Sequence, residues 1–156
     1  MESTETIDVT PLQKIRRVLD QQGVLAVLRI LNGRAPHRFT AIYRYEPPIL
    51  RNVYLVDAFN PALERGDDVA LKDAYCGLLS ERRPSLAFGA PADVPGLPKL
   101  ASPAVSYCGV LLTMADGTPY GSLCHFDTMR CEWPTSEMPL LESVAPWIMA
   151  AIEARG

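Results

Sequence analysis

The sequence has no hydrophobic run long enough to cross a membrane and no start typical of a secreted protein. Its longest apolar stretch, residues 24–31, contains Arg29, whereas a membrane-spanning helix needs about 18 or more consecutive apolar residues. The first residues, Met1-Glu-Ser-Thr-Glu-Thr6, are polar and acidic, without the positive start and apolar centre of a secretion signal. These absences predict a soluble, cytoplasmic protein with no membrane partner.

Positive charge, histidine and closely spaced cysteines are also scarce. The net charge of −3 argues against nucleic acid as a partner, because binding phosphates requires a basic patch. Zinc sites favour two ligands within about five residues, but Cys124 and Cys131 are separated by six residues and the chain has only 2 histidines. We therefore expect no metal site. Without a secretion signal, the 4 cysteines are expected to be reduced thiols.

Signatures of common catalytic sites are missing as well. Ser106 and Ser122 lack the G-x-S-x-G setting of a hydrolase nucleophile. Gly109, Gly117 and Gly121 do not form a phosphate-binding loop. The sequence therefore identifies no catalytic residue.

The length and composition predict one folded domain. A chain of 156 residues with 48% hydrophobic and 21% charged residues can bury one core and is too short for two ordinary domains. We expect a disordered tail at residues 1–9 and a single domain at 10–156. Thr10-Pro11 has the features of a helix start, and a second helix is expected at 24–32, after Gly23.

Alternating and aromatic-rich runs predict five strands. The first two are 37–45 and 50–59, and a helix is expected over 71–80, which Pro84 prevents from continuing far. The later strands are 85–88, 105–114 and the run ending at Asp127, and a last helix spans 136–155. The strand 105–114 is apolar on both alternating sets, so both of its faces should be covered. This order indicates an α+β fold with a mostly antiparallel sheet.

Several segments resemble, in the same order, the motifs of one family. These are Leu71-Lys-Asp-Ala-Tyr-Cys76, Ser106-Tyr-Cys-Gly-Val110, the run from Asp116-Gly117 to Asp127, and Leu140-Leu-Glu-Ser-Val-Ala145. Together they resemble the GAF domains, which are small ligand-sensing modules. The resemblance implies a GAF/PAS-like (profilin-like) five-stranded antiparallel sheet of order 2-1-5-4-3 with helices on both faces. It also implies terminal helices on one face and a binding pocket on the other.

The same resemblance brings several predicted segments around a ligand cavity. The expected ligand-binding residues are Phe59, Tyr75, Cys76, Phe88, Tyr107 and Phe126. The loop 89–103 is long enough to be functional or mobile, and we expect it to border the cavity. Candidate polar groups are Asp57, Asp73, Ser106 and Thr113.

The cysteines have both a chemical and a structural interpretation. On the predicted helix, Lys72 lies one turn before Cys76, so the lysine could lower the pKa of that thiol. A buried free cysteine more often simply fills space. Cys108 and Cys124 are expected near each other on two joined strands, and Cys131 is expected to be the most exposed.

Three functions fit these features. The first is a sensory or regulatory GAF-like domain that binds a small molecule and acts through a signalling partner or its oligomeric state; its ligand and any cofactor stay unidentified, because one fold hosts many ligands. The second is a thiol-based redox enzyme of the free methionine-R-sulfoxide reductase type, although the sequence lacks the G-x-G-V-C-G-like segment of that branch. The third is an interaction module with a vestigial pocket.

The last predicted helix carries two apolar stripes, where a monomer needs one. Leu141, Ala145, Ile148 and Ile152 form the first stripe, and Leu140, Val144, Trp147 and Ala151 form the second. Because a tryptophan on a free face leaves an exposed apolar patch, we expect a homodimer through the terminal helices.

Overall fold

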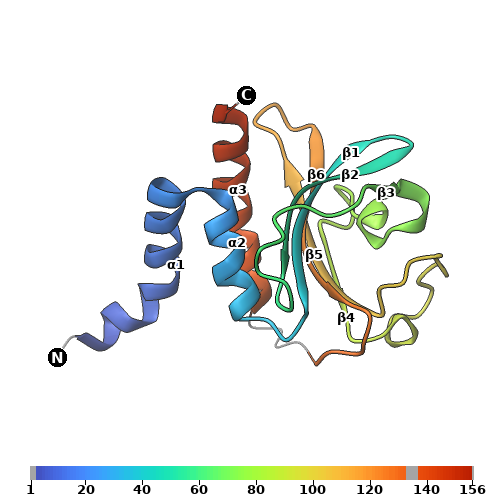
Figure 1. Cartoon of the computed structure of the whole chain (residues 1–156), viewed down its shortest axis with the longest axis horizontal. Coiled ribbons are helices and arrows are strands. Elements are labelled where there is room, and N and C mark those ends of the chain that lie inside the picture. The colour runs from blue at the N-terminus through green and yellow to red at the C-terminus, as the bar shows by residue number, and fades with distance from the viewer. Residues whose placement is uncertain (1–2, 133–136, 156) are drawn as a thin grey trace.

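A computed structural model describes residues 3–132 and 137–155 as one antiparallel sheet with three α-helices on one face (Figure 1). The helices α2 and α3 lie on the sheet, and α1 packs against them on the outside. The elements in chain order are α1 (Ser3–Gln22), α2 (Val24–Gly33), β1 (Phe39–Glu46), β2 (Ile49–Asp57), β3 (Val69–Ala70), the 3₁₀ turns η1 (Leu71–Asp73) and η2 (Tyr75–Leu78), β4 (Ser85–Phe88), the 3₁₀ turn η3 (Pro91–Asp93), β5 (Ser106–Thr113), β6 (Pro119–Asp127) and α3 (Met138–Arg155).

The strand order β3-β2-β1-β6-β5-β4 confirms the predicted order of the five longer strands. The predicted strands 1 to 5 correspond to β1, β2, β4, β5 and β6, and every pair is antiparallel. The sixth strand, β3, has only two residues and pairs with Ile49 and Leu50 at the edge. A two-residue strand is too short to show alternation, so the prediction of five strands missed it.

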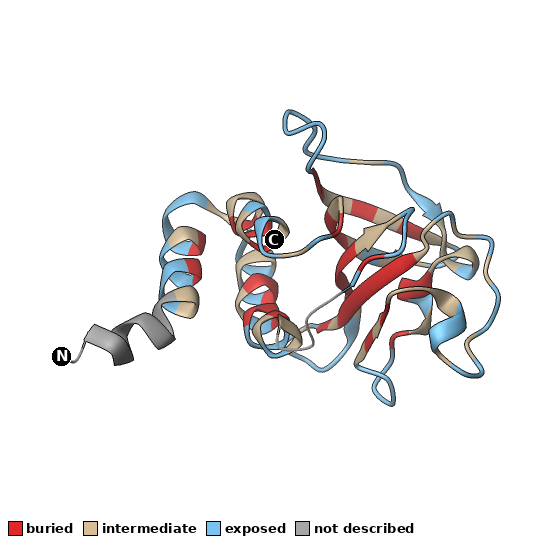
Figure 2. Cartoon of the chain, turned by 90° about the horizontal axis from the view of Figure 1, so that it is seen from below, coloured by how far each residue is buried: buried red, intermediate tan, exposed pale blue. Residues whose placement is uncertain are grey.

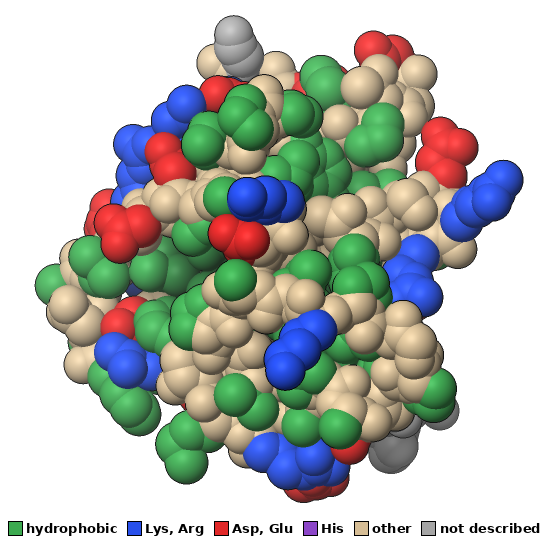
Figure 3. Space-filling model, turned by 90° about the vertical axis from the view of Figure 1, so that its right-hand side faces the viewer, with side chains coloured by type: hydrophobic (Ala, Val, Ile, Leu, Met, Phe, Trp, Pro, Cys, Tyr) green, Lys and Arg blue, Asp and Glu red, His purple; other side chains and the backbone are tan. Residues whose placement is uncertain are grey.

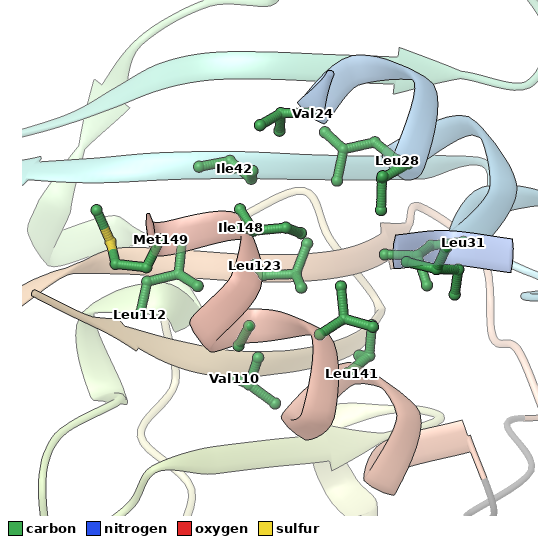
Figure 4. Close-up of a cluster of buried hydrophobic side chains, with 14 of the residues drawn as sticks. Val24, Leu28, Leu31, Ile42, Val110, Leu112, Leu123, Leu141, Ile148 and Met149 are labelled. Carbon is green, nitrogen blue, oxygen red and sulfur yellow. The ribbon is translucent and has the colours of Figure 1, made fainter. Parts of the chain in front are cut away.

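Two clusters of buried side chains fill the two sides of the sheet. Figure 2 marks buried residues both on the strands and on the helices. On the helix side, Val110, Leu112 and Leu123 pack against α2 and α3 (Figure 4). On the other side, Tyr107 and Cys124 pack with the segment that contains η2. Both faces of β5 are therefore covered, as its doubly apolar sequence predicted.

The prediction of an α-helix at 71–80 is wrong. The segment forms two separate 3₁₀ turns, because Ala74 between them is extended with φ −114° and ψ 142°. A side chain at Gly77 would lie 2.9 Å from the Leu71 carbonyl oxygen, which shows how tightly the chain folds here. Packing of Tyr75 and Cys76 onto the sheet outweighs local helix propensity.

The helices differ from the sequence predictions in two further ways. The first helix begins at Ser3, earlier than the Thr10-Pro11 pair, and contains Pro11. All three α-helices lie on one face, and among the described residues the turns η1, η2 and η3 provide the helical structure on the other face. Among the described residues, no helix combines the length and the apolar character needed to cross a membrane.

Candidate functional site

A pocket of about 270 Å³ lies on the sheet face opposite the α-helices. Figure 3 views the molecule from this side, where hydrophobic side chains gather in hollows of the surface. The walls come from the sheet, from the η2 segment and from the chain that precedes β5. They comprise Phe39, Tyr43, Leu50, Val69, Ala74, Tyr75, Cys76, Ser102, Pro103, Ala104, Tyr107, Cys124, Phe126 and Thr128.

The wall of this pocket is almost entirely apolar. None of the described residues that line it is Asp, Glu, Lys or Arg. The residues that line it include Tyr43, Ser102 and Thr128, which carry hydroxyl groups, and the two cysteines Cys76 and Cys124. Burial raises the pKa of the Tyr43 phenol well above its usual range, so this hydroxyl stays neutral.

Four of the six predicted ligand-binding residues, Tyr75, Cys76, Tyr107 and Phe126, line the pocket. Phe88 lies behind the wall, with its ring centroid 5.0 Å from that of Tyr75. Phe59 lies outside the pocket: it is 77% exposed, and the Arg38 guanidinium sits 4.5 Å from its ring centroid.

The predicted polar groups have other partners or positions. Asp57 accepts two hydrogen bonds from Arg38, at 2.8 and 2.9 Å. The Ser106 hydroxyl donates to the Met129 carbonyl, and neither Asp73 nor Thr113 lines the pocket.

Sequence reasoning missed the wall contributed by β1. Phe39 and Tyr43 line the pocket, and alternate residues of a strand point to the same face. The aromatic residues of β1 at even spacing were a usable signal for this wall.

A cluster of hydrogen-bonding groups surrounds the Cys76 thiol in the pocket wall. The Tyr107 and Ser122 hydroxyls donate to Cys76 Sγ at 3.2 and 3.0 Å. The Cys124 thiol lies 3.9 Å away, sulfur to sulfur. Ser122 and Cys124 are two residues apart on β6, so both reach the same face of the sheet.

These contacts distinguish the two thiols. Hydrogen bonding with Cys124, and from the Ser122 and Tyr107 hydroxyls, lowers the pKa of Cys76 and outweighs the opposing effect of burial. The interaction with Cys76 and burial together raise the pKa of Cys124. Of this pair, Cys76 is therefore the thiol that ionises first. The predicted effect of Lys72 on Cys76 assumed that both lie on one continuous helix, which this segment does not form.

The two remaining cysteines, Cys108 and Cys131, do not line the pocket. Cys108 pairs with His125 across the β5–β6 ladder, while Cys124 pairs with Gly109. Adjacent residues of a strand point to opposite faces, so Cys108 lies in the helix-side cluster and Cys124 in the pocket-side cluster. Cys131 is the most exposed of the four cysteines, as predicted, although only 9% of its surface is accessible. Among the described residues, no group of three or more His, Cys, Asp or Glu could hold a metal ion.

A stacked pair of histidines lies buried away from the pocket. The rings of His37 and His125 are 5.7 Å apart, centroid to centroid, and nearly parallel. The Thr40 hydroxyl lies 2.6 Å from His125 Nδ1 and accepts a hydrogen bond from Asn32. Burial lowers the pKa of His37 to about 4 and that of His125 to about 3. Both rings are therefore neutral at pH 7.

The chain matches no protein-family model and no curated protein significantly in sequence. Solved structures, in contrast, resemble it closely in fold. The GAF domain of Acinetobacter phosphoenolpyruvate-protein phosphotransferase superposes with a TM-score of 0.74 at 12% identity, over 95% of this chain and 94% of that chain. A putative GAF sensor protein from Burkholderia vietnamiensis gives a TM-score of 0.69 at 16% identity, over 95% and 96%.

A further similar structure is an enzyme. Free methionine-R-sulfoxide reductase from Neisseria meningitidis, solved in complex with its substrate, gives a TM-score of 0.69 at 15% identity, over 92% of this chain and 86% of that chain. Similarity at such low identity establishes architecture and leaves function open. The strand order and these superpositions together show that the chain has a GAF-like fold.

Proposed function

We propose that this protein is a small-molecule-binding sensory or regulatory domain whose pocket takes a small, uncharged and largely apolar ligand. The observation that carries the proposal is the pocket of about 270 Å³ without a charged side chain in its described wall. Ligand sites are typically apolar concavities with a few polar groups that orient the ligand. The Ser102, Thr128 and Tyr43 side chains supply such groups here.

The wall also argues against charged ligands. A phosphate or carboxylate is bound by cationic side chains or by several convergent N–H donors. An unpaired charge placed in an apolar cavity loses its hydration without compensation. The pocket therefore disfavours cyclic nucleotides and other anionic ligands.

Filling the pocket tests this proposal. Ala104 lines the cavity, whereas Ala101 in the same segment is exposed and does not. In a thermal-shift panel of uncharged metabolites, we expect at least one compound to raise the melting temperature of the wild type and of the control Ala101→Phe. At a hundredfold excess over Kd the stabilisation is about 2.7 kcal/mol, which corresponds to about 5–10 °C. The response should disappear in Ala104→Phe. A panel that stabilises none of the three proteins would favour the vestigial-pocket alternative.

A redox enzyme of the free methionine-R-sulfoxide reductase type is the second candidate. It is favoured by the two thiols, Cys76 and Cys124, in the wall of the pocket. It is disfavoured by the uncharged wall, since free methionine sulfoxide carries an ammonium and a carboxylate that both need partners. Methionine-R-sulfoxide with thioredoxin as reductant is therefore included in the panel. Turnover that is lost in Cys76→Ser would establish the enzyme in place of the sensor.

We further propose that the effect of ligand binding is transmitted to a signalling partner protein, or through a homodimer formed by the terminal helices. Within one chain, α1 covers part of the second stripe of α3, since the Arg16 guanidinium lies 5.2 Å from the Trp147 ring centroid. Leu140, Trp147 and Ala151 stay partly exposed.

Sedimentation at micromolar concentration tests the dimer. We expect a dimer for the wild type and dissociation in Trp147→Glu, because a charge would be placed in the apolar contact. The control Ala150→Glu adds the same charge at an exposed position of α3 and should stay dimeric. A wild type that is monomeric throughout would contradict the proposal.

A further inference from the structure

We propose that Cys76 and Cys124 are an oxidation site in the pocket wall: hydrogen peroxide converts them into a reversible disulfide, with Cys76 as the sulfur that reacts first. The prediction that the disulfide forms depends only on the geometry of the two thiols. Its consequence for ligand binding rests on the proposed function.

The distance between the two sulfurs is that of two free thiols close enough to form a disulfide after a small movement. The Sγ atoms are 3.9 Å apart, and a disulfide of about 2.05 Å requires them to approach by roughly 1.9 Å. Cys124 is held in the sheet between Ala41 of β1 and Gly109 of β5. Cys76 lies in the short turn η2, so this turn is the part that can move toward the sheet.

The turn has few constraints of its own. Its backbone bonds include Gly77 N–H to the Ala74 carbonyl at 3.0 Å and Leu79 N–H to the Cys76 carbonyl at 3.3 Å. The Tyr45 hydroxyl also donates to the Cys76 carbonyl. Short segments with few internal hydrogen bonds open at low free-energy cost compared with sheet strands.

The surroundings identify Cys76 as the nucleophile. Its sulfur accepts hydrogen bonds from two hydroxyls and faces the Cys124 thiol, and donors of this kind stabilise a thiolate. The lowered pKa of Cys76 and the raised pKa of Cys124 agree with that assignment. Cys108 is on the opposite face of the sheet, so it cannot compete for the bond.

The chemistry proceeds in two balanced steps. The Cys76 thiolate attacks one peroxide oxygen, the O–O bond breaks, and Cys76 becomes a sulfenic acid while hydroxide leaves. The Cys124 sulfur then attacks the Cys76 sulfur, the S–O bond breaks, and water leaves with the Cys124 proton. The two sulfurs together lose two electrons, which reduce the peroxide. Since Cys76 lines the pocket, the peroxide reaches it through the ligand cavity.

Oxidation is expected to change the pocket. Tyr107 and Ser122 lose the thiolate acceptor of their hydrogen bonds, and buried hydroxyls without acceptors are unfavourable. Movement of η2 also displaces Ala74 and Tyr75, which line the cavity. By linkage, a ligand that binds the reduced pocket more tightly must oppose oxidation to the same extent.

Peptide mapping of the peroxide-treated protein tests the bond directly. Trypsin places Cys76 on the peptide 73–82 and both Cys108 and Cys124 on the peptide 100–130. We expect these two peptides to be cross-linked after treatment with hydrogen peroxide and separated again by dithiothreitol. The cross-link should persist in Cys108→Ser, and this result would assign it to Cys124. Tandem mass spectra of the wild-type peptides should identify the same cysteine without a substitution. Absence of the cross-link, or a cross-link through Cys108 or Cys131, would overturn the proposal.

Variants test the order of the two steps. Cys124→Ser should stop at the sulfenic acid, detected as a dimedone adduct on Cys76. Tyr107→Phe or Ser122→Ala should slow peroxide consumption at neutral pH by about tenfold or more, because each hydroxyl donates a hydrogen bond that stabilises the Cys76 thiolate. If both variants consume peroxide as fast as the wild type, the claim that the two hydroxyls activate the Cys76 thiol is wrong.

The two proposals fail separately. A protein that forms the disulfide but binds no compound of the panel contradicts the sensor function alone. A protein that binds a compound but never forms the bond contradicts the oxidation site alone.

Discussion

Lowering the pH from 7.5 to 5 is expected to reduce the free energy of unfolding by about 4 kcal/mol. The cause is the buried pair His37 and His125, whose pKa values burial lowers to about 4 and about 3 from the ordinary 6.5. Because the folded state keeps both rings neutral at pH 5 and the unfolded state protonates them, acid favours unfolding. Each histidine contributes about 2 kcal/mol over this interval.

The sign of the effect defines its pH window. The stabilisation is fully present above pH 6.5 and is lost as the pH falls from there through the lowered folded values. The chain has no other histidine. Hydrogen bonds from Arg38 to Asp57 and from Thr118 to Asp116 lower the pKa of both carboxyls. These two groups therefore take up protons at a lower pH than ordinary carboxyls do.

Urea unfolding followed at several pH values measures this loss. The expected slope near pH 5 is about 2.7 kcal/mol per pH unit for two histidines. The variant His37→Phe should halve the slope, whatever its stability at neutral pH, because one titrating group is gone. A wild type whose unfolding free energy is constant from pH 7.5 to 5 would show that the rings are not buried and neutral.

Replacement of Gly121 by alanine is expected to destabilise the protein by roughly 3 kcal/mol or more. Gly121 lies on β6 between Arg44 of β1 and Leu112 of β5. A Cβ at this position would overlap the Tyr43 carbonyl oxygen and lie 2.9 Å from the Arg44 Cα. Since these are backbone atoms of a neighbouring strand, relief requires the two strands to separate.

The control for this variant is Gly33→Ala at the end of α2. No atom lies within 4 Å of a Cβ built on Gly33, and alanine favours helix over glycine by about 0.5–1 kcal/mol. Chemical denaturation should therefore show a neutral or stabilising effect for Gly33→Ala and a large loss for Gly121→Ala. Equal effects of the two substitutions would contradict close contact between β1 and β6.

The long strands were predictable because their signals are local and strong, whereas their order was implied by the resemblance to the GAF domains. The doubly apolar run of β5 and the turn at Asp116-Gly117 determine the central hairpin, where Gly117 has φ 90°. The turns η1 and η2 were not predictable, since an apolar pattern at helical spacing looks the same in both structures. Only the packing of Tyr75 and Cys76 on the sheet distinguishes them.

The pocket was predicted through the resemblance to the GAF domains, and strand pairing explains why two of the predicted residues share its wall. Tyr107 and Phe126 lie opposite each other in the β5–β6 register, and both line the wall. Phe59 follows the end of β2 and contacts the long side chain of Arg38. No periodicity in the sequence reveals this contact. The neighbourhood of Cys76 and Cys124 depends in the same way on how the η2 turn docks onto β6.

The placement of the chain ends has a practical consequence for labelling and immobilisation. The described start of α1 and the end of α3 both lie on the helical side of the sheet (Figure 1), and the pocket is on the other side. A fluorophore, affinity tag or surface linker attached at either end is therefore held away from the pocket mouth. Surface-based binding measurements can use terminal attachment, whereas coupling through Cys76 or Cys124 would alter the cavity wall itself.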